Sequence, residues 1–363
     1  MLTALLVIAI LVLLIVSHEL GHFIAAKIFD VRVDEFGIGY PPRAFLFGKI
    51  GDTEYTFNWI PFGGFVRLFG EDGEAAKERG SFAHADKWKQ ALILVAGVFA
   101  NALVAWMLFT LALNVGVPRI IDTPQQGQTV KLFVSDVVPG SPAAAGGLIA
   151  GDEITAVTSA SGEKTKTLSP DGIVDFVSIR GGQSLSVTYV RAHKENAVVM
   201  RPANSVVPGA EGRPALGIGL VFVSDESLGI FNAMYQGFLT MLNAFQYIGN
   251  SLWTIVSGAV SGTADLSQVV GPVGLVGVIG EASRSGAGYV LELAAFIAVN
   301  LAIINLVPIP ALDGGRLVIV GIEAILRRPP PRLIMQIINT VGIALVIFLM
   351  LTVTYHDIAR LFA

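Results

Sequence analysis

The feature that most constrains this chain is an almost uninterrupted apolar run from Leu2 to Ile28 that carries two histidines and a glutamate. A helix needs about 20 apolar residues to cross a bilayer, so this run is long enough to span one. Its polar residues lie in the second half, in the sequence SHELGH at residues 17–22. A charge at the bilayer centre costs roughly 2.5–3.5 kcal/mol on insertion scales, and such residues usually have a partner or a function. The run therefore predicts a membrane helix, 1–28, that contains a functional site.

The spacing of these polar residues indicates a metal site. Residues four apart share one face of a helix, so His18 and His22 can bind one ion with Glu19 beside them. Zinc accepts neutral imidazole nitrogens and keeps an open position when it is catalytic. In a His-Glu-x-x-His helix the glutamate is the general base toward the attacking water. The alternative is a chance match in a helix with two hydrogen-bonded histidines, and the motif still needs a third ligand from elsewhere.

The composition of the whole chain indicates an integral membrane protein with some soluble mass. Of the 363 residues, 53% are hydrophobic and 14% are charged, whereas ordinary soluble domains are about 25% charged. The net charge of −4 gives no indication of the basic patch that nucleic-acid binding requires, so no nucleic-acid partner is expected. The chain has no cysteine, which excludes disulfides and thiolate metal ligands. The N-terminus lacks the basic region of a signal peptide, so we expect the first helix to be retained.

The next segment, 29–87, predicts β-structure at membrane depth. It is rich in Lys and Arg, a bias that marks the cytoplasmic side. Residues 45–50 and 53–60 flank Gly51-Asp52 as in a β-hairpin; we expect turns in the apolar run 36–42 and a further turn and strand at 61–68, which contains Phe65. Non-helical backbone is tolerated in a membrane when it lines a protein cavity. We expect a re-entrant sheet whose free edge pairs with an extended substrate; the alternative is a small cytoplasmic β-domain packed on itself.

Further apolar segments predict the rest of an α-helical membrane fold with about four transmembrane helices. These segments are 88–114, 289–310 and 332–355, and the last is followed by a tail at 356–363. The first of them carries Asn101 in apolar surroundings, where an amide either ties helices together or belongs to a site.

The segment 228–264 is uncharged, but its amides share one helical face: Asn232, Gln236, Asn243, Gln246 and Asn250. An amide stripe opposite an apolar face favours a helix at the interface, or packed on the bundle, over a span. A linker, 265–288, with the sequence GPVG at 271–274, is expected to break the chain after it.

Between the second and third membrane helices, residues 117–223 have the composition of a soluble α+β domain. Strands are expected at 131–138, 185–190 and 197–201, with a helix that starts at Ser169-Pro170. The run PGSPAAAGGLIAGDEI resembles the core of PDZ domains, which implies a groove that receives a peptide end by strand addition. The alternative is a spacer or steric gate without ligand affinity. Parity of the spans places the domain outside the cytoplasm.

The third membrane helix ends in the polar sequence NLVPIPALDGGR at 305–316. Asp313 is the candidate third ligand, since a carboxylate oxygen binds zinc at about 2.0–2.2 Å; the alternative is that it caps a helix at 314–326. The prolines stop a regular helix, so the chain can bend toward the first one. Asn305 is a candidate donor to the substrate carbonyl. The loop 311–331 and the start of the next helix carry three basic residues, Arg327, Arg328 and Arg332. They place this loop on the cytoplasmic side of the membrane. Asp313 therefore reaches the histidines only if 228–264 does not cross the membrane.

Together HELGH, the PDZ-like insert, GPVG and NLVPIPALDGG resemble the bacterial site-2 proteases of the RseP type over essentially the whole chain. The resemblance implies an intramembrane zinc metalloprotease of the bacterial inner membrane. Its substrates would be single-pass membrane regulators, such as anti-sigma factors already cut elsewhere, and remnant signal peptides. It implies Zn²⁺ on His18, His22 and Asp313 with Glu19 as base, and substrate handling by Asn305 and the segment Pro61-Phe62-Gly63-Gly64. Some members have two PDZ domains, whereas this chain has one, and Val98 stands where members often have proline.

Two alternative functions that do not involve proteolysis remain open at this point. One is a PDZ-bearing membrane scaffold with a structural zinc, and the other is a zinc carrier, since intramembrane His and Asp also mark ion paths. Glu19 distinguishes them from a protease, because hydrolysis needs it and a structural site does not. A protease would also prefer substrates with helix-breaking residues, since a helical carbonyl is already hydrogen-bonded.

Overall fold

The computed structural model describes residues 2–71, 78–124, 129–191, 194–204, 212–262, 270–327 and 331–361. The chain divides into two compact units. The first comprises Met1–Val115 and Leu228–Ala363, and the second is Gly116–Ser227.

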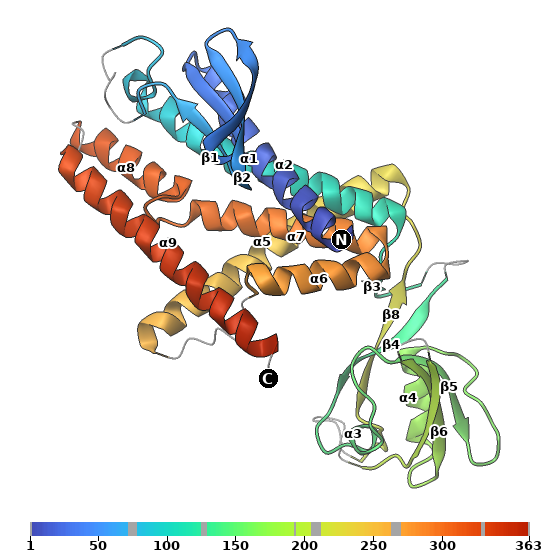
Figure 1. Ribbon diagram of the computed structural model, residues 1–363. Coiled ribbons are helices and arrows are strands. Elements are labelled where there is room, and N and C mark those ends of the chain that lie inside the picture. Colours follow the sequence, from blue (N-terminus) through green and yellow to red (C-terminus); the bar gives the residue numbers. More distant parts are fainter. Residues whose placement is uncertain are drawn as a thin grey trace. The chain divides into compact units, whose positions relative to one another are not determined.

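Among the described residues, four helices of the first unit are long and apolar enough to cross a membrane (Figure 1). They are α1 (Leu2–Ile28), α2 (Lys87–Val115), α7 (Ala287–Leu306) and α9 (Arg332–Leu361). The predicted class, a helical membrane protein with some β-structure, is confirmed at this level. The amide-rich segment forms α5 (Ile230–Ser261), which has 32 residues and is not among these four.

Helix α2 lies at the centre of the first unit and contacts α1, α5 and α7. Small residues allow these close approaches. A Cβ on Gly21 of α1 would collide with the Ala96 carbonyl and lie 2.8 Å from Ala100 Cβ. A Cβ on Gly237 of α5 would lie 2.8 Å from the Thr110 hydroxyl. The helices therefore pack backbone to backbone on both sides of α2.

Helix α5 turns the face opposite its amides toward this bundle. Ala233, Met241 and Ala244 are buried on that face, while all five amides of the stripe are exposed. The Trp106 indole donates a hydrogen bond to the Met234 carbonyl at 2.9 Å, which fastens α5 to α2. The sequence pattern thus predicted which face of α5 packs.

The segment after α1 forms a sheet of two long strands, β1 (Val33–Ile50) and β2 (Thr53–Leu68), followed by a 3-10 turn, η1 (Phe82–His84). Gly37 of β1 is partnered by both Phe65 and Thr56. Residues 33–38 therefore lie between 64–68 and 54–57, and 43–50 pair with 53–58. Among the described residues the sheet edges are consequently 64–68 and 43–50.

The turns predicted at 36–42 and 61–64 are confirmed, because the chain reverses its direction at both places. Residues 35–38 run in the same direction as their partners 54–57 but opposite to their partners 64–68, and residues 43–50 run opposite to 53–58. Gly39 and Gly63 have positive φ angles, +82° and +143°, and register shifts occur between Ile38 and Tyr40 and between Tyr40 and Arg43. Glycine adopts the positive φ angles that tight reversals require, and Gly39 and Gly63 lie in these two reversals. A Cβ on Gly63 would collide with the Tyr40 ring, so the bend also needs glycine for space.

Two segments expected to be irregular are helical. Of the predicted linker 265–288, residues 265–269 lie outside the described residues, and the rest contains α6 (Pro272–Ser285). The Asp357 carboxylate accepts hydrogen bonds from the N–H groups of Gly271 and Gly274 at 3.1 and 2.8 Å. It lies in the predicted tail, where α9 continues to Leu361. Because a distant side chain satisfies the first turn of α6, the GPVG sequence starts a helix here rather than breaking one.

In the described residues of the second unit there is a six-stranded sheet with strand order β3-β8-β4-β5-β6-β7 and there are two helices. The elements are β3 (Arg119–Ile121), β4 (Lys131–Val137), α3 (Pro142–Ala145), β5 (Glu153–Ser159), α4 (Pro170–Ser178), β6 (Leu185–Arg191), β7 (Lys194–Met200) and β8 (Ile218–Ser224). The predicted Ser169 cap is confirmed, since its side chain accepts from the Gly172 N–H. Helix α4 and the strands share one core, which includes Leu132, Ile154 and Phe176. Strands β3, β5 and β8 were not predicted.

Asp152 anchors this unit. It is fully buried, accepts from Arg191 Nε and Nη2 at 2.6 and 2.7 Å, and accepts from the Ile149 N–H at 2.9 Å. Burial acts to raise the pKa of Asp152, but the hydrogen bonds from Arg191 and the Ile149 N–H outweigh it and hold the pKa below its ordinary value. The stabilisation is therefore present above the unfolded pKa of about 3.9 and is lost as the pH falls through the folded one.

We expect Asp152→Asn to lower the free energy of unfolding of the unit 116–227 by about 2–4 kcal/mol at pH 7, because it leaves Arg191 with a neutral amide. Urea unfolding of this unit, which has its own core, measures the change. The difference between the two proteins should shrink below about pH 4. A difference that is equally large at pH 3 and pH 7 would show that the carboxylate charge contributes nothing.

Candidate active site

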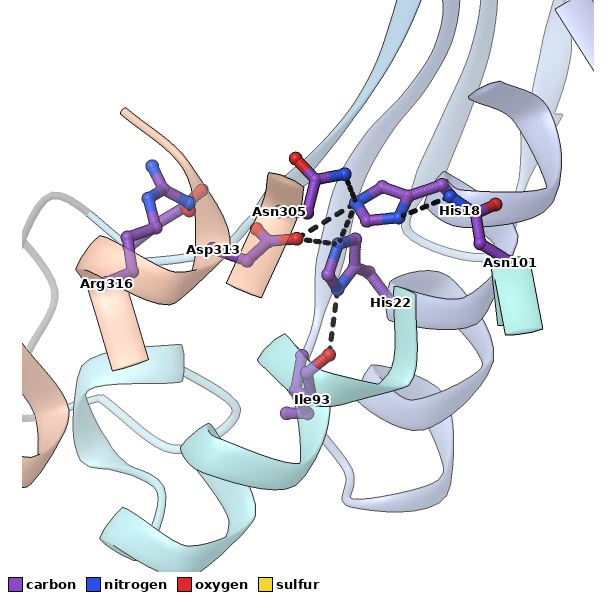
Figure 2. A network of polar contacts seen from close by, with 8 residues as sticks. His18, His22, Ile93, Asn101, Asn305, Asp313 and Arg316 are labelled. Atoms are coloured by element: carbon purple, nitrogen blue, oxygen red, sulfur yellow. Dashed lines mark hydrogen bonds and ion pairs between the residues drawn. The ribbon is translucent and has the colours of Figure 1, made fainter. Parts of the chain in front are cut away.

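Helix α1 brings its two histidines together one turn apart. The His18 and His22 rings are buried, nearly perpendicular at 87°, and 4.7 Å apart between centroids. Their Nε2 atoms lie 3.1 Å from each other. Figure 2 shows both nitrogens turned toward the same point.

Asp313 meets the histidines from the other end of the chain. It is the first residue of α8 (Asp313–Leu326), and its Oδ2 lies 2.9 Å from His18 Nε2 and 3.2 Å from His22 Nε2 (Figure 2). The residue at the N-cap position is Leu312, whose side chain makes no capping hydrogen bond. The alternative reading of Asp313 as a helix cap is therefore wrong, since its carboxylate turns to the imidazoles instead.

These three residues fit a zinc ion. In a tetrahedral site with bonds of about 2.0–2.2 Å, ligand atoms lie about 3.3–3.6 Å from each other, so small outward shifts of these three atoms would make room for the ion. The three separations here are 2.9, 3.1 and 3.2 Å. Two imidazole nitrogens and one carboxylate oxygen form a ligand set that zinc uses at catalytic sites, with one position left open. Among the described residues, His18, His22 and Asp313 form a group of potential ligands that lie close enough together to hold a metal ion.

One face of α2 contacts the two histidine rings on the side of their Nδ1 atoms. His22 Nδ1 is 2.8 Å from the Ile93 carbonyl, to which it donates, and Asn101 Nδ2 is 3.4 Å from His18 Nδ1. Between them lies Gly97, where a Cβ would collide with the His22 ring and lie 2.8 Å from His18 Cε1. Residues four apart share a helix face, so this spacing was visible in the sequence, yet only Asn101 was noticed as a possible site residue.

The NLVPIPALDGG sequence folds the chain back after α7 so that Asp313 can reach the histidines. Helix α7 ends at Leu306, and α8 begins at Asp313. A Cβ on Gly314 would collide with the Leu306 carbonyl, and one on Gly315 would collide with the Ile309 carbonyl. The two glycines therefore permit the tight return.

Asn305 lies in the last turn of α7, beside His18. Its Nδ2 is 3.4 Å from His18 Nε2 (Figure 2). Its amide therefore faces the same point as the three candidate ligands, as the proposed substrate contact requires.

The sheet edge 64–68 passes beside Glu19. A Cβ on Gly64 would lie 3.3 Å from Glu19 Cγ, and the Val66 N–H hydrogen-bonds the Glu19 carboxylate. Of the residues predicted to handle substrate, Gly63, Gly64 and Phe65 belong to this part of β2. The side chains of Pro61 and Phe62 lie outside the described residues. The structure thus places the candidate base between the candidate ligands and an open strand.

Two ion pairs that the sequence did not reveal hold α8 in place. Arg316, one turn after Asp313, pairs with Glu71 just beyond β2. Lys87 at the start of α2 pairs with Glu323 at 2.5 Å. Nothing local identifies either pair, because the partners are 245 and 236 residues apart.

Comparison with known proteins agrees with this geometry. The sequence pattern of peptidase family M50 matches residues 6–349. A Clostridium perfringens protein provisionally named a zinc metalloprotease is 33% identical over 346 residues, which cover 95% of each chain. A protein of Agrobacterium fabrum with the same kind of name is 30% identical over 380 residues, or 98% of this chain and 95% of the relative. The zinc metalloprotease RasP of Geobacillus kaustophilus is 27% identical over 433 residues, covering 96% of each.

The helical membrane fold and these relatives define the class, a membrane zinc metalloendopeptidase. The chain belongs to peptidase family M50, the site-2 protease family, as its sequence predicted. Zinc is accordingly its cofactor.

Proposed function

We propose that the protein is an intramembrane protease of the RseP type that hydrolyses peptide bonds within transmembrane segments. Its substrates are single-pass membrane regulators, such as anti-sigma factors, and remnant signal peptides. The observation that carries this proposal is the meeting of His18, His22 and Asp313 beside Glu19. The family resemblance favours the inner membrane of a bacterium. The Lys and Arg residues of 29–87 favour a site toward the cytoplasm, and the parity of the spans then favours a second unit outside the cytoplasm.

In the proposed reaction His18, His22 and Asp313 hold the metal. When bound, zinc polarises the scissile carbonyl and makes water a better nucleophile near neutral pH. Glu19 takes a proton from the attacking water and delivers it to the leaving nitrogen. The Asn305 amide donates to the carbonyl oxygen as negative charge develops there.

The sheet edge 64–68 is proposed to hold the substrate in an extended conformation. A helical carbonyl is hydrogen-bonded to the N–H four residues ahead, so the scissile segment must unwind before water can attack. An unpaired strand edge offers replacement hydrogen bonds to an extended chain. The position of this edge beside Glu19 supports its role, and helix-breaking residues lower the cost of unwinding.

The second unit is proposed to be a single PDZ-type domain that receives a peptide end. Strand β8 pairs with β3 only through Phe222, Val223 and Ser224. Among the described residues, the same side of β8 is unpaired over 218–221, which leaves room for strand addition.

The test uses the protein reconstituted in liposomes with two matched substrates, one with a Gly-Pro pair in its transmembrane segment and one with leucines there. We expect the Gly-Pro substrate to be cleaved at least about tenfold faster, since two helical hydrogen bonds of about 1 kcal/mol need not be broken. Phe65→Pro should slow cleavage by at least about tenfold without changing zinc content. Phe47→Pro, on the far edge, is the control and should leave cleavage near the wild-type rate.

Equal cleavage of the two substrates would contradict the requirement for unwinding. Loss of both zinc and cleavage in Phe65→Pro would instead favour the reading of β1 and β2 as a domain that only packs on itself. Zinc content therefore separates a role in substrate binding from a role in folding.

A further inference from the structure

Asn101 is an unusual residue for the middle of a membrane helix. Its side chain is fully buried, with 0% of the residue exposed. Its Nδ2 lies 3.4 Å from His18 Nδ1, while its Oδ1 is buried without a hydrogen-bond partner among the described residues. A buried polar atom without a partner needs an explanation.

The chemistry of His18 supplies one. His18 turns Nε2 toward Asp313 and His22, so a metal held there takes the lone pair of Nε2. The ring is then neutral, its hydrogen is on Nδ1, and Nδ1 needs an acceptor. His22 shows the same arrangement, with Nδ1 donating to the Ile93 carbonyl at 2.8 Å.

Among the described residues Asn101 is the group bonded to His18 Nδ1, whereas Asn305 lies on the Nε2 side. The oxygen and nitrogen of an amide have nearly the same shape, and their assignment depends on the hydrogen-bond network. Rotating the Asn101 amide by half a turn places Oδ1 against Nδ1–H. The rotation gives the unpaired oxygen a partner and gives His18 the acceptor that it lacks (Figure 2).

We infer that Asn101 is a positioning residue, whose amide oxygen accepts a hydrogen bond from His18 Nδ1–H and keeps His18 in the tautomer that binds zinc through Nε2. The inference rests on the proposed role of His18 as a zinc ligand. Residues that orient metal-binding histidines in this way contribute about 10–100-fold to metal affinity.

The test measures the zinc affinity of the purified full-length protein by competition with a graded chelator. Asn101→Leu, which keeps the branched shape of the side chain but has no acceptor, should bind zinc about 10–100-fold more weakly. Asn101→Asp, which keeps an oxygen at the same place, should bind within about threefold of wild type or more tightly. Asn114→Leu is the matched control in the same helix; its amide donates to the Leu228 carbonyl, and its zinc affinity should not change.

The two Asn101 variants separate the possible roles. If Asn101→Asp weakens zinc binding as much as Asn101→Leu, the amide acts as a donor or by packing, and the inference is wrong. Unchanged affinity in Asn101→Leu would also overturn it. If Asn101→Leu does not fold, as judged by circular dichroism and thermal unfolding, Asn101→Ala takes its place in the same comparison. His18→Ala tests the underlying ligand assignment separately, because full zinc binding by that variant would reject the proposed site rather than the role of Asn101.

Discussion

Replacing Glu19 by glutamine is expected to leave the zinc content unchanged and to lower the cleavage rate by about 10²–10⁴-fold, the contribution that general acid–base catalysis usually makes. Glutamine keeps the shape of the side chain but cannot accept a proton. Asp313, not Glu19, completes the triangle with the two histidines. Zinc per protein and single-turnover cleavage of a transmembrane substrate measure the two effects.

The control for this substitution is Glu292→Gln in α7. The Glu292 carboxyl has no hydrogen bond or ion pair among the described residues, so its replacement should not slow cleavage. Equal activity of Glu19→Gln and wild type would reject the protease mechanism and favour a scaffold or zinc carrier. Loss of zinc in Glu19→Gln would show that the glutamate is a ligand.

Replacing Gly97 by alanine is expected to remove zinc binding and cleavage together. An added Cβ would collide with the His22 ring and lie 2.8 Å from His18 Cε1. Helices α1 and α2 pack closely at Gly21, so a movement of α2 away from the rings would lose this packing. The rings must therefore turn away from Asp313, and because both ligands are displaced we expect zinc affinity to fall by at least about 100-fold.

Gly249→Ala in α5 is the matched control, because nothing lies within 4 Å of a Cβ at that position. It should keep zinc and cleavage, and the helix should become more stable by roughly 0.5–1 kcal/mol. Wild-type zinc affinity in Gly97→Ala would mean that the rings are not confined by α2. The two substitutions at the site thus give different signatures, loss of cleavage alone for Glu19 and loss of both for Gly97.

The parts of the structure that depend on local spacing could be predicted from the sequence. The face shared by His18 and His22 follows from a spacing of four residues, and the packing face of α5 follows from its amide stripe. Asp313 was recognised because a carboxylate among prolines in an apolar sequence needs a reason. Its meeting with the histidines also required the argument that α5 does not cross the membrane.

The parts that were wrong or missed depend on contacts between distant residues. The turns near Gly39 and Gly63 were predicted, but the pairing of 33–38 with both 54–57 and 64–68 was missed, because it joins segments that are not adjacent in the sequence. The GPVG sequence looked like a linker because Asp357, which accepts from its N–H groups, is 83 and 86 residues away. Gly97 looked like any small residue in a membrane helix, since nothing in α2 alone shows that two imidazole rings lie against it.

The separation of the proposed ligands along the chain has a consequence for biosynthesis. His18 and Asp313 are 295 residues apart, and Asp313 opens the helix after α7. A chain that ends before Asp313 contains Glu19 and both histidines but lacks the third of the proposed ligands. If these residues hold the zinc, the metal site is therefore completed only late in translation.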